Sequence, residues 1–148
     1  MEKTFIRIRS TKDIIISTSL IILGCILLEL PDGEALNITG FFLLLVGCIL
    51  AAVLKSGYKD TETGEKYLKK ERYFQQAMNA EISSAIASEP ESIDLSQEDK
   101  GNAVRVDVYF SKSAGKAYVQ VFEYVPYRYE PSSKMYEYEI PKVAKLIE

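Results

Sequence analysis

Two long apolar runs near the N-terminus constrain this chain more than any other feature. They cover residues 14–30 and 38–54, are dominated by Ile and Leu, and contain no charged side chain before Glu29. Each run is roughly 25 Å long as an α-helix, which is near the lower limit for crossing the hydrocarbon core of a bilayer. Their apolar content outweighs the cost of Ser17, Thr18 and Ser19 on an insertion scale. The sequence therefore predicts a transmembrane helical hairpin.

Two alternatives to a membrane hairpin are open at this point. A soluble helical hairpin normally carries one polar stripe per helix, and neither run has one. A cleaved signal sequence is suggested by the basic start and by residues 22–25, which resemble a lipoprotein signal box. The chain stays apolar after Cys25, however, and a second span follows, which favours an uncleaved anchor.

Basic residues flank both runs and predict the orientation of the hairpin. Lys3, Arg7, Arg9 and Lys12 precede the first run, and Lys55, Lys59, Lys66, Lys69, Lys70 and Arg72 follow the second. The turn between the runs contains Asp32 and Glu34 and no basic residue. The positive-inside rule then predicts that both termini are cytoplasmic. The four cations from Lys66 to Arg72 either bind anionic lipid headgroups or form a solvated face.

Small residues recur along both runs. Ser17 and Gly24 lie on the first, and Gly40, Gly47 and Ala51 on the second. Such spacing allows close approach of membrane helices, either within the hairpin or between copies of the chain. Cys25 and Cys48 are interpreted as small apolar packing residues and not as a disulfide.

The remainder of the chain predicts one small α+β domain. A linker over residues 56–63 leads to a basic helix over 65–88 and an acidic loop over 89–102. Alternating residues then predict three antiparallel strands over 103–111, 117–125 and 135–140, with a short extended piece at 127–130 and a terminal helix from Pro141. The predicted fold is a membrane α-helical hairpin over residues 1–57 and a cytosolic α+β domain over residues 58–148. A three-stranded sheet with one long helix gives only a small hydrophobic core, which favours a homo-oligomer.

Composition argues against several kinds of site. The chain has no histidine, both of its cysteines lie in the apolar runs, and its net charge is −3. We therefore expect no metal, no cofactor, no catalytic residue and no duplex nucleic acid as partner. No glycine-rich phosphate loop is present either.

Tyrosine is the most conspicuous residue of the predicted domain. The chain has 10 tyrosines, most of them from Tyr109 onward, interleaved with cations. Aromatic faces stack on bases and cations pair with phosphates, which predicts a nucleotide site. Equally, tyrosine forms strands well and packs against a helix or a partner chain. The candidate ligand-binding residues are Arg105, Tyr109, Lys112, Lys116, Tyr118, Arg128, Tyr129 and Lys134, and Arg105 is expected to share a face with Asp107 and Tyr109.

The order of two spans followed by a Tyr-rich β region over residues 103–140 resembles a group of antiphage effectors. These are the two-span membrane effectors of type III CRISPR defence that bind cyclic tetra-adenylate. CBASS effectors with two spans have a similar order, but their eight-stranded barrel is longer than this β region. The resemblance implies a bacterial inner-membrane protein that binds a cyclic oligonucleotide and perturbs the bilayer.

Two functional hypotheses follow from these patterns. In the first, an anchored homo-oligomer senses a cyclic nucleotide messenger. In the second, the protein is a membrane immunity or accessory protein whose Tyr-rich sheet docks a protein partner. The sequence leaves both open.

Overall fold

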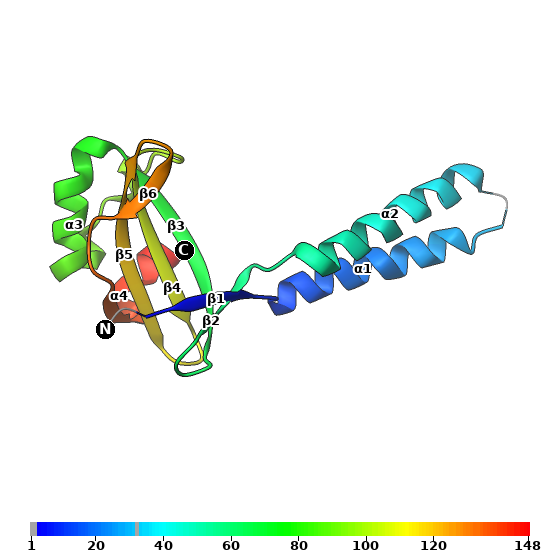
Figure 1. The fold of residues 1–148 in the computed structure, drawn as a ribbon, viewed down its shortest axis with the longest axis horizontal. Helices are drawn as coiled ribbons and strands as arrows, with labels where there is room; N and C mark the ends of the chain where they lie inside the picture. Colours follow the sequence, from blue (N-terminus) through cyan, green and yellow to red (C-terminus); the bar gives the residue numbers. More distant parts are fainter. Residues whose placement is uncertain (1–2, 32) are drawn as a thin grey trace. The chain divides into compact units, whose positions relative to one another are not determined.

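A computed structural model describes residues 3–31 and 33–148 as two compact units (Figure 1). One unit, Arg7–Gly57, contains the two long apolar helices. The other joins the residues up to Ile6 with Tyr58–Glu148 and contains most of an antiparallel sheet. We call them the hairpin unit and the sheet unit.

Two antiparallel helices, α1 (Thr11–Leu28) and α2 (Glu34–Val53), form the hairpin unit and pack along each other (Figure 1). Helix α1 begins at a capping box, in which the Ser10 side chain accepts from the Asp13 amide and the Asp13 side chain accepts from the Ser10 amide. Both helices are long and apolar enough to cross a membrane. The two predicted helices are therefore confirmed, with limits that differ by a few residues.

Glycines set the contact between α1 and α2. A Cβ atom added to Gly24 would lie 2.6 Å from the Leu44 amide nitrogen, and one added to Gly40 would lie 2.8 Å from the Gly24 carbonyl oxygen. Gly47 faces Ile21 in the same way. These residues are used for packing within the hairpin, so Gly40 and Gly47 do not form an exposed seam between copies.

The remaining surface of the hairpin is apolar and exposed. It includes Ile14, Ile15, Ile22, Leu23, Ile26, Phe41, Phe42, Leu45, Val46, Ile49 and Val53. Cys25 and Cys48 are also exposed on this surface and are not packing residues, which corrects the prediction from sequence.

Seven strands form the sheet, where the sequence predicted three. They are β1 (Phe5–Ile8), β2 (Gly57–Asp60), β3 (Lys66–Phe74), β4 (Val104–Ser111), β5 (Lys116–Val125), β6 (Arg128–Pro131) and β7 (Tyr136–Glu139). The order is β1-β2-β3-β4-β5-β6, and β7 pairs with β5 beyond the end of β6. The strands predicted at 103–111, 117–125 and 135–140 correspond to β4, β5 and β7.

The basic helix predicted over residues 65–88 is wrong in its first half. Residues Lys66–Phe74 form β3, which pairs with β4 in a register that sets Leu68 opposite Phe110. Helix α3 (Asn79–Ser88) begins only after a 3₁₀ turn over Gln76–Met78. The segment alternates with period two as well as near helical spacing, and pairing to β4 decides in favour of the strand.

Two further segments for which the sequence predicted no strand contain one. The predicted linker over 56–63 contains β2, which forms a hairpin with β3. The basic N-terminal tail contains β1. The hairpin unit is thus connected to two neighbouring strands of the sheet.

One face of the sheet holds the hydrophobic core. Val104, Val106 and Val108 of β4 are fully buried in one cluster with Ile82 and Ile86 of α3. Helix α4 (Ile140–Ile147) adds Val143 and Leu146 to the same cluster, and Ile93 enters it from the 89–102 loop. That loop is confirmed as largely irregular, with short 3₁₀ turns at Pro90–Ser92 and Leu95–Gln97.

Candidate functional site

Polar and aromatic side chains cover the face of the sheet opposite the core. The register sets Glu71 beside Asp107 and Gln120, Lys69 beside Tyr109 and Tyr118, and Tyr73 beside Arg105 and Phe122. We call this surface of β3, β4 and β5 the polar face. It confirms the prediction that Arg105, Asp107 and Tyr109 lie on one side of their strand.

Asp107 is the centre of the polar face and is only 1% exposed. Arg105 approaches it with two nitrogens, Nη2 at 3.1 Å from Oδ2 and Nε at 2.8 Å from Oδ1. The Lys69 Nζ atom lies 3.2 Å from the same Oδ2 atom. Burial raises the pKa of the Asp107 carboxyl, and the two cations in contact with it oppose this rise.

Glu71 extends the cluster and balances its charge. Its carboxylate lies 2.9 Å from Lys69 Nζ and accepts a 2.6 Å hydrogen bond from the Tyr73 hydroxyl. Burial tends to raise the pKa of Glu71, but the Tyr73 hydrogen bond and the Lys69 ion pair outweigh burial and lower it. Two cations and two carboxylates leave the cluster without net charge, so it offers no surplus positive charge to a phosphate.

The Arg105 guanidinium is also enclosed by aromatic rings. Its Cζ atom lies 4.7 Å from the centroid of Phe122 and 4.6 Å from that of Tyr129. These contacts and the Asp107 ion pair restrict the position of the guanidinium. Arg105 is therefore positioned, as the sequence predicted, but it is positioned by this chain and is already paired.

Phe5 of β1 covers the tyrosines at the other end of the polar face. Its ring stacks on Tyr109 with a centroid separation of 4.3 Å and an interplanar angle of 9°. It also contacts Tyr67 edge-on at 5.2 Å and lies 5.9 Å from Tyr118. The predicted ligand residues Tyr109 and Tyr118 thus have a ring of this chain as their partner.

Lys3 ties the same N-terminal segment to the sheet. Its Nζ atom lies 3.0 Å from Asp60, which is 1% exposed, and 3.0 Å from Glu62. The Thr61 amide donates to the Thr4 carbonyl over 3.1 Å. The hydrogen bonds to Asp60 and Glu62 raise the pKa of Lys3, which keeps it charged.

The other predicted ligand residues are spread over the sheet unit. Lys116 pairs with Glu137 at 2.9 Å, Arg128 pairs with Glu130, and Lys134 lies 5.2 Å from the Tyr136 ring centroid. Lys112 is exposed in the turn between β4 and β5. The structure brings Arg105 together with Tyr129 and Tyr109 together with Tyr118, and it does not bring the eight residues into one site.

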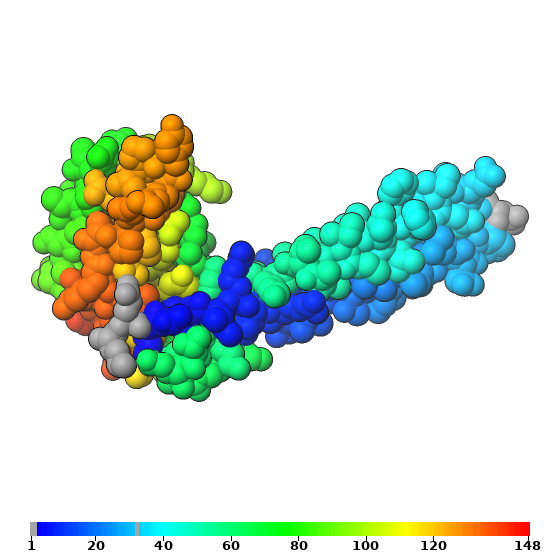
Figure 2. All heavy atoms as spheres, viewed as in Figure 1, coloured from blue at the N-terminus to red at the C-terminus, as the bar shows by residue number. Residues whose placement is uncertain are grey.

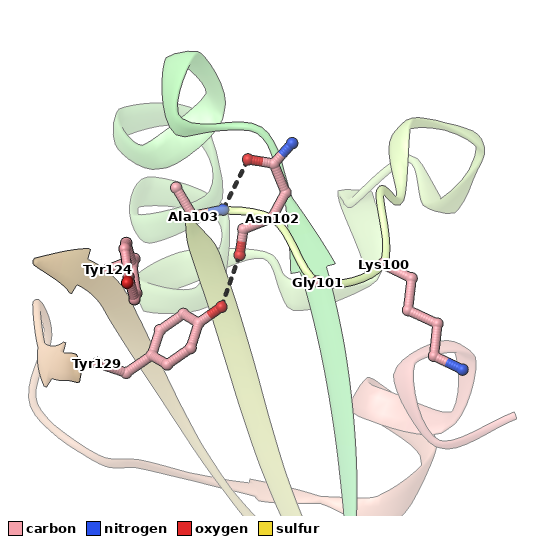
Figure 3. A pocket seen from close by; sticks show the side chains of 6 residues that line it. All are labelled: Lys100, Gly101, Asn102, Ala103, Tyr124 and Tyr129. Carbon is pink, nitrogen blue, oxygen red and sulfur yellow. Dashed lines mark hydrogen bonds between the residues drawn. The ribbon is translucent and has the colours of Figure 1, made fainter. Parts of the chain in front are cut away.

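A cavity of about 520 Å³ lies at the end of β4 and β5, lined by Lys100, Gly101, Asn102, Ala103, Tyr124 and Tyr129. The Tyr129 hydroxyl donates to the Asn102 carbonyl over 2.9 Å, and the Tyr124 and Tyr129 rings meet edge-on at 5.3 Å. Figure 3 shows the Lys100 side chain extending away from both rings. The cavity is thus an aromatic and amide-lined recess.

Tyr127 stands beside this cavity in the turn between β5 and β6, and its side chain is 96% exposed. It has a φ of 72°, a left-handed conformation that side chains other than Gly and Asn rarely adopt. Its amide donates to the Tyr124 hydroxyl over 3.2 Å. We call Tyr124, Pro126, Tyr127 and Arg128 the aromatic tip, which forms the orange projection of the sheet unit in Figure 2.

Sequence reasoning missed Lys69, Glu71, Phe122 and Phe5. The period-two order of Tyr67, Lys69, Glu71 and Tyr73 in residues 66–74 is a signal for the first two. Phe5 is brought to Tyr109 by long-range strand order, for which the sequence carries no local signal.

Comparison of the chain with protein-family models, with curated proteins and with solved structures finds no match. Among the described residues, no group of three or more His, Cys, Asp or Glu side chains is placed to hold a metal ion.

Proposed function

We propose that this protein is a membrane-anchored docking module. The hairpin unit holds it in a lipid bilayer, and the sheet unit binds a protein partner through the aromatic tip. The observation that carries the docking proposal is Tyr127, a fully exposed aromatic side chain kept in a left-handed conformation at the end of a strand hairpin.

Three features support membrane anchoring. The helices contain 18 and 20 residues, which at 1.5 Å per residue corresponds to about 27–30 Å, the thickness of a hydrocarbon core. Their outer surfaces are apolar, and an exposed apolar surface of this extent marks a membrane or a partner. The basic residues flanking the pair favour cytoplasmic termini in a bacterial inner membrane.

The state of the cations favours a protein partner over a nucleotide. Arg105, Lys116 and Arg128 are each paired with a carboxylate of this chain. A phosphate would have to displace these carboxylates before it gained an ion pair. A protein interface instead uses exposed aromatic side chains as anchors, and the aromatic tip offers Tyr127 beside a recess.

The left-handed backbone conformation of Tyr127 also supports a binding role for its side chain. A side chain in the left-handed region costs roughly 1–2 kcal/mol in the free protein. Tyr127 makes up none of that cost through burial, because it is 96% exposed. Strained residues concentrate at functional sites, and contact with a partner supplies the missing burial.

Substitution of Tyr127 by glycine separates docking from folding. Because glycine relieves the left-handed strain, Tyr127→Gly should raise the free energy of unfolding of the sheet unit by about 1 kcal/mol. Gly115, with a φ of 69° in the β4–β5 turn, is the matched control, and Gly115→Ala should lower it by a similar amount.

Docking itself is tested by placing a photo-crosslinking amino acid in the full-length protein in its native membranes. Placed at Arg128, beside Tyr127, it should yield one defined protein adduct, which Tyr127→Gly removes. Placed at the exposed Lys142 of α4, it should yield no such adduct. An Arg128 adduct that survives Tyr127→Gly, or no adduct at either position, would contradict docking through the tip.

The cyclic nucleotide sensor of antiphage defence, as a homo-oligomer, stays an alternative supported by the recess beside Tyr124 and Tyr129. Stacking of a base on either ring is the chemistry it would use. Cyclic tetra-adenylate should then raise the melting temperature of the full-length protein in detergent, and Tyr124→Ala should abolish that rise. This result, with no protein adduct at the tip, would favour the alternative.

A further inference from the structure

Four exposed cations gather at one end of the hairpin unit. Arg7, Arg9 and Lys12 lie just before or at the start of α1, and Lys55 follows the end of α2. Because the helices are antiparallel, the start of α1 and the end of α2 lie at the same end. A 2.9 Å hydrogen bond between the Ser10 and Ser56 hydroxyls fixes this juxtaposition. We call these four residues the basic end.

The acidic residue nearest to these cations in the hairpin unit is turned inward. Asp13 is 3% exposed, and its carboxylate accepts from the Ser10 amide at 2.9 Å, the Ser56 amide at 2.7 Å and the Ser56 hydroxyl at 2.7 Å. The two hydrogen bonds from Ser56 join the end of α2 to the start of α1. The four cations form no ion pair within residues 3–31 and 33–148, so their charge is directed to the surroundings.

The opposite end of the hairpin unit has the reverse charge. Glu29 and Glu34 are exposed there, and residues 29–36 contain no Lys or Arg. The unit therefore has an apolar middle, a cationic end and an anionic end. A neutral anchor would need only the apolar middle.

We propose that the basic end binds the phosphate groups of acidic phospholipids in the leaflet that it faces. The inference rests on the proposed membrane anchoring. Arg7 and Arg9 present planar guanidinium groups that match a phosphate in two-point contact, and Lys12 and Lys55 act as point charges. The N-terminus of α1 is capped by Ser10, so the side chains and not the helix amides provide the site.

Two of the four cations from Lys66 to Arg72, for which the sequence left lipid binding or a solvated face open, have partners within the sheet unit. Lys69 is bound to Asp107 and Glu71 in the polar face. Arg72 donates to the Leu146 carbonyl and pairs with Glu98 at 3.0 Å. Lys69 and Arg72 are thus already paired within the sheet unit, whereas the four cations of the basic end form no ion pair among the described residues.

The test measures how many phosphatidylglycerol molecules stay bound to full-length protein released from neutral detergent micelles, by native mass spectrometry. Phosphatidylcholine is the reference lipid, and glycerol 3-phosphate tests whether a free phosphate is enough. Wild-type protein should retain phosphatidylglycerol in preference to phosphatidylcholine and should not retain glycerol 3-phosphate. Each cation removed should weaken that preference about fivefold.

The decisive variant is R7Q/R9Q/K12Q/K55Q, and its control is K59Q/K66Q/K112Q/K142Q, which removes the same charge from exposed positions outside the basic end. The first should lose the preference for phosphatidylglycerol and the second should keep it. The charge-preserving variant R7K/R9K should keep most of the preference, because the positive charge at both positions is retained.

Three results would overturn the inference: equal loss in both quadruple variants, equal retention of both lipids by wild type, or retention of glycerol 3-phosphate as firmly as of lipid. A separate flotation assay with phosphatidylcholine vesicles tests the anchoring itself. Protein that floats with these vesicles but shows no lipid preference would contradict phospholipid binding by the basic end and leave the membrane anchor intact. Protein that stays in the soluble fraction contradicts the anchor.

Discussion

Asp107 decides whether the polar face is a binding site or a structural cluster. It is buried between Arg105 and Lys69, and its removal leaves both cations without their shared partner. A buried ion pair that loses one member typically costs about 3–5 kcal/mol. We therefore expect Asp107→Asn to lower the free energy of unfolding by about that amount, as measured by urea titration of the tyrosine fluorescence.

Arg128 provides the control for this prediction. Its ion pair with Glu130 is exposed, so Arg128→Ala should change the free energy of unfolding by less than about 0.5 kcal/mol. An Asp107→Asn variant as stable as wild type would show that Arg105 is free to bind a ligand. That result would favour the cyclic nucleotide sensor over the docking module.

The buried Tyr67 and the half-buried Tyr73 on the polar face predict a loss of stability at alkaline pH. Burial raises the pKa of Tyr67 to about 12, and burial with the Glu71 hydrogen bond raises that of Tyr73 to about 12. In the unfolded chain both titrate near 10.0, so between these values the unfolded state loses protons that the folded state keeps.

Stability should therefore be constant up to about pH 10 with respect to these groups and should fall as the pH rises toward 12. Tyrosinate absorbance followed with pH should show an early phase from exposed tyrosines and a late phase that coincides with unfolding. A single phase near pH 10 without unfolding would contradict the burial of Tyr67 and Tyr73.

At the scale of elements, glycine contacts hold α1 against α2. Because a Cβ on Gly24 would lie 2.7 Å from the Gly40 carbonyl oxygen, Gly24→Ala must push the helices apart. We expect a loss of about 1–3 kcal/mol, the usual cost of overpacking. Circular dichroism during thermal unfolding in detergent measures it. Ala52→Leu, on the exposed side of α2, should melt like wild type, and equal effects of both substitutions would contradict the close contact.

The helices and strands differ in how well the sequence predicts them. The apolar runs and the alternation of Val104, Val106 and Val108 are strong local signals, and both predicted the structure correctly. Residues 66–74 carry two periods at once, and only the long pairing with β4 resolves them. Strand β1 has four residues, and its neighbour β2 follows in the sequence only after both helices of the hairpin unit. No local pattern therefore predicts β1.

The candidate site was less predictable than the fold for a related reason. The face occupied by Arg105 follows from strand alternation and was predicted. Its partners follow from cross-strand register, which sets Lys69 and Glu71 beside Asp107 and Tyr109. The stacking of Phe5 on Tyr109 joins two residues that are more than 100 positions apart in the sequence.

At the scale of the whole molecule, the account depends on a bilayer around the hairpin unit. The chain leaves the sheet through β1, forms the two apolar helices and returns through β2. Cys25 and Cys48, the chain's only two cysteines, lie on the outer surface of those helices. Their thiols therefore report directly on what surrounds the hairpin.

The most direct measurement is labelling of the native protein in isolated membranes with a membrane-impermeant maleimide. The account predicts that the protein stays in the membrane fraction after an alkaline wash. It also predicts that neither thiol reacts until a denaturing detergent is added, because the hydrocarbon core excludes the charged reagent. Rapid labelling of both cysteines without detergent, on protein recovered in the soluble fraction, would contradict it.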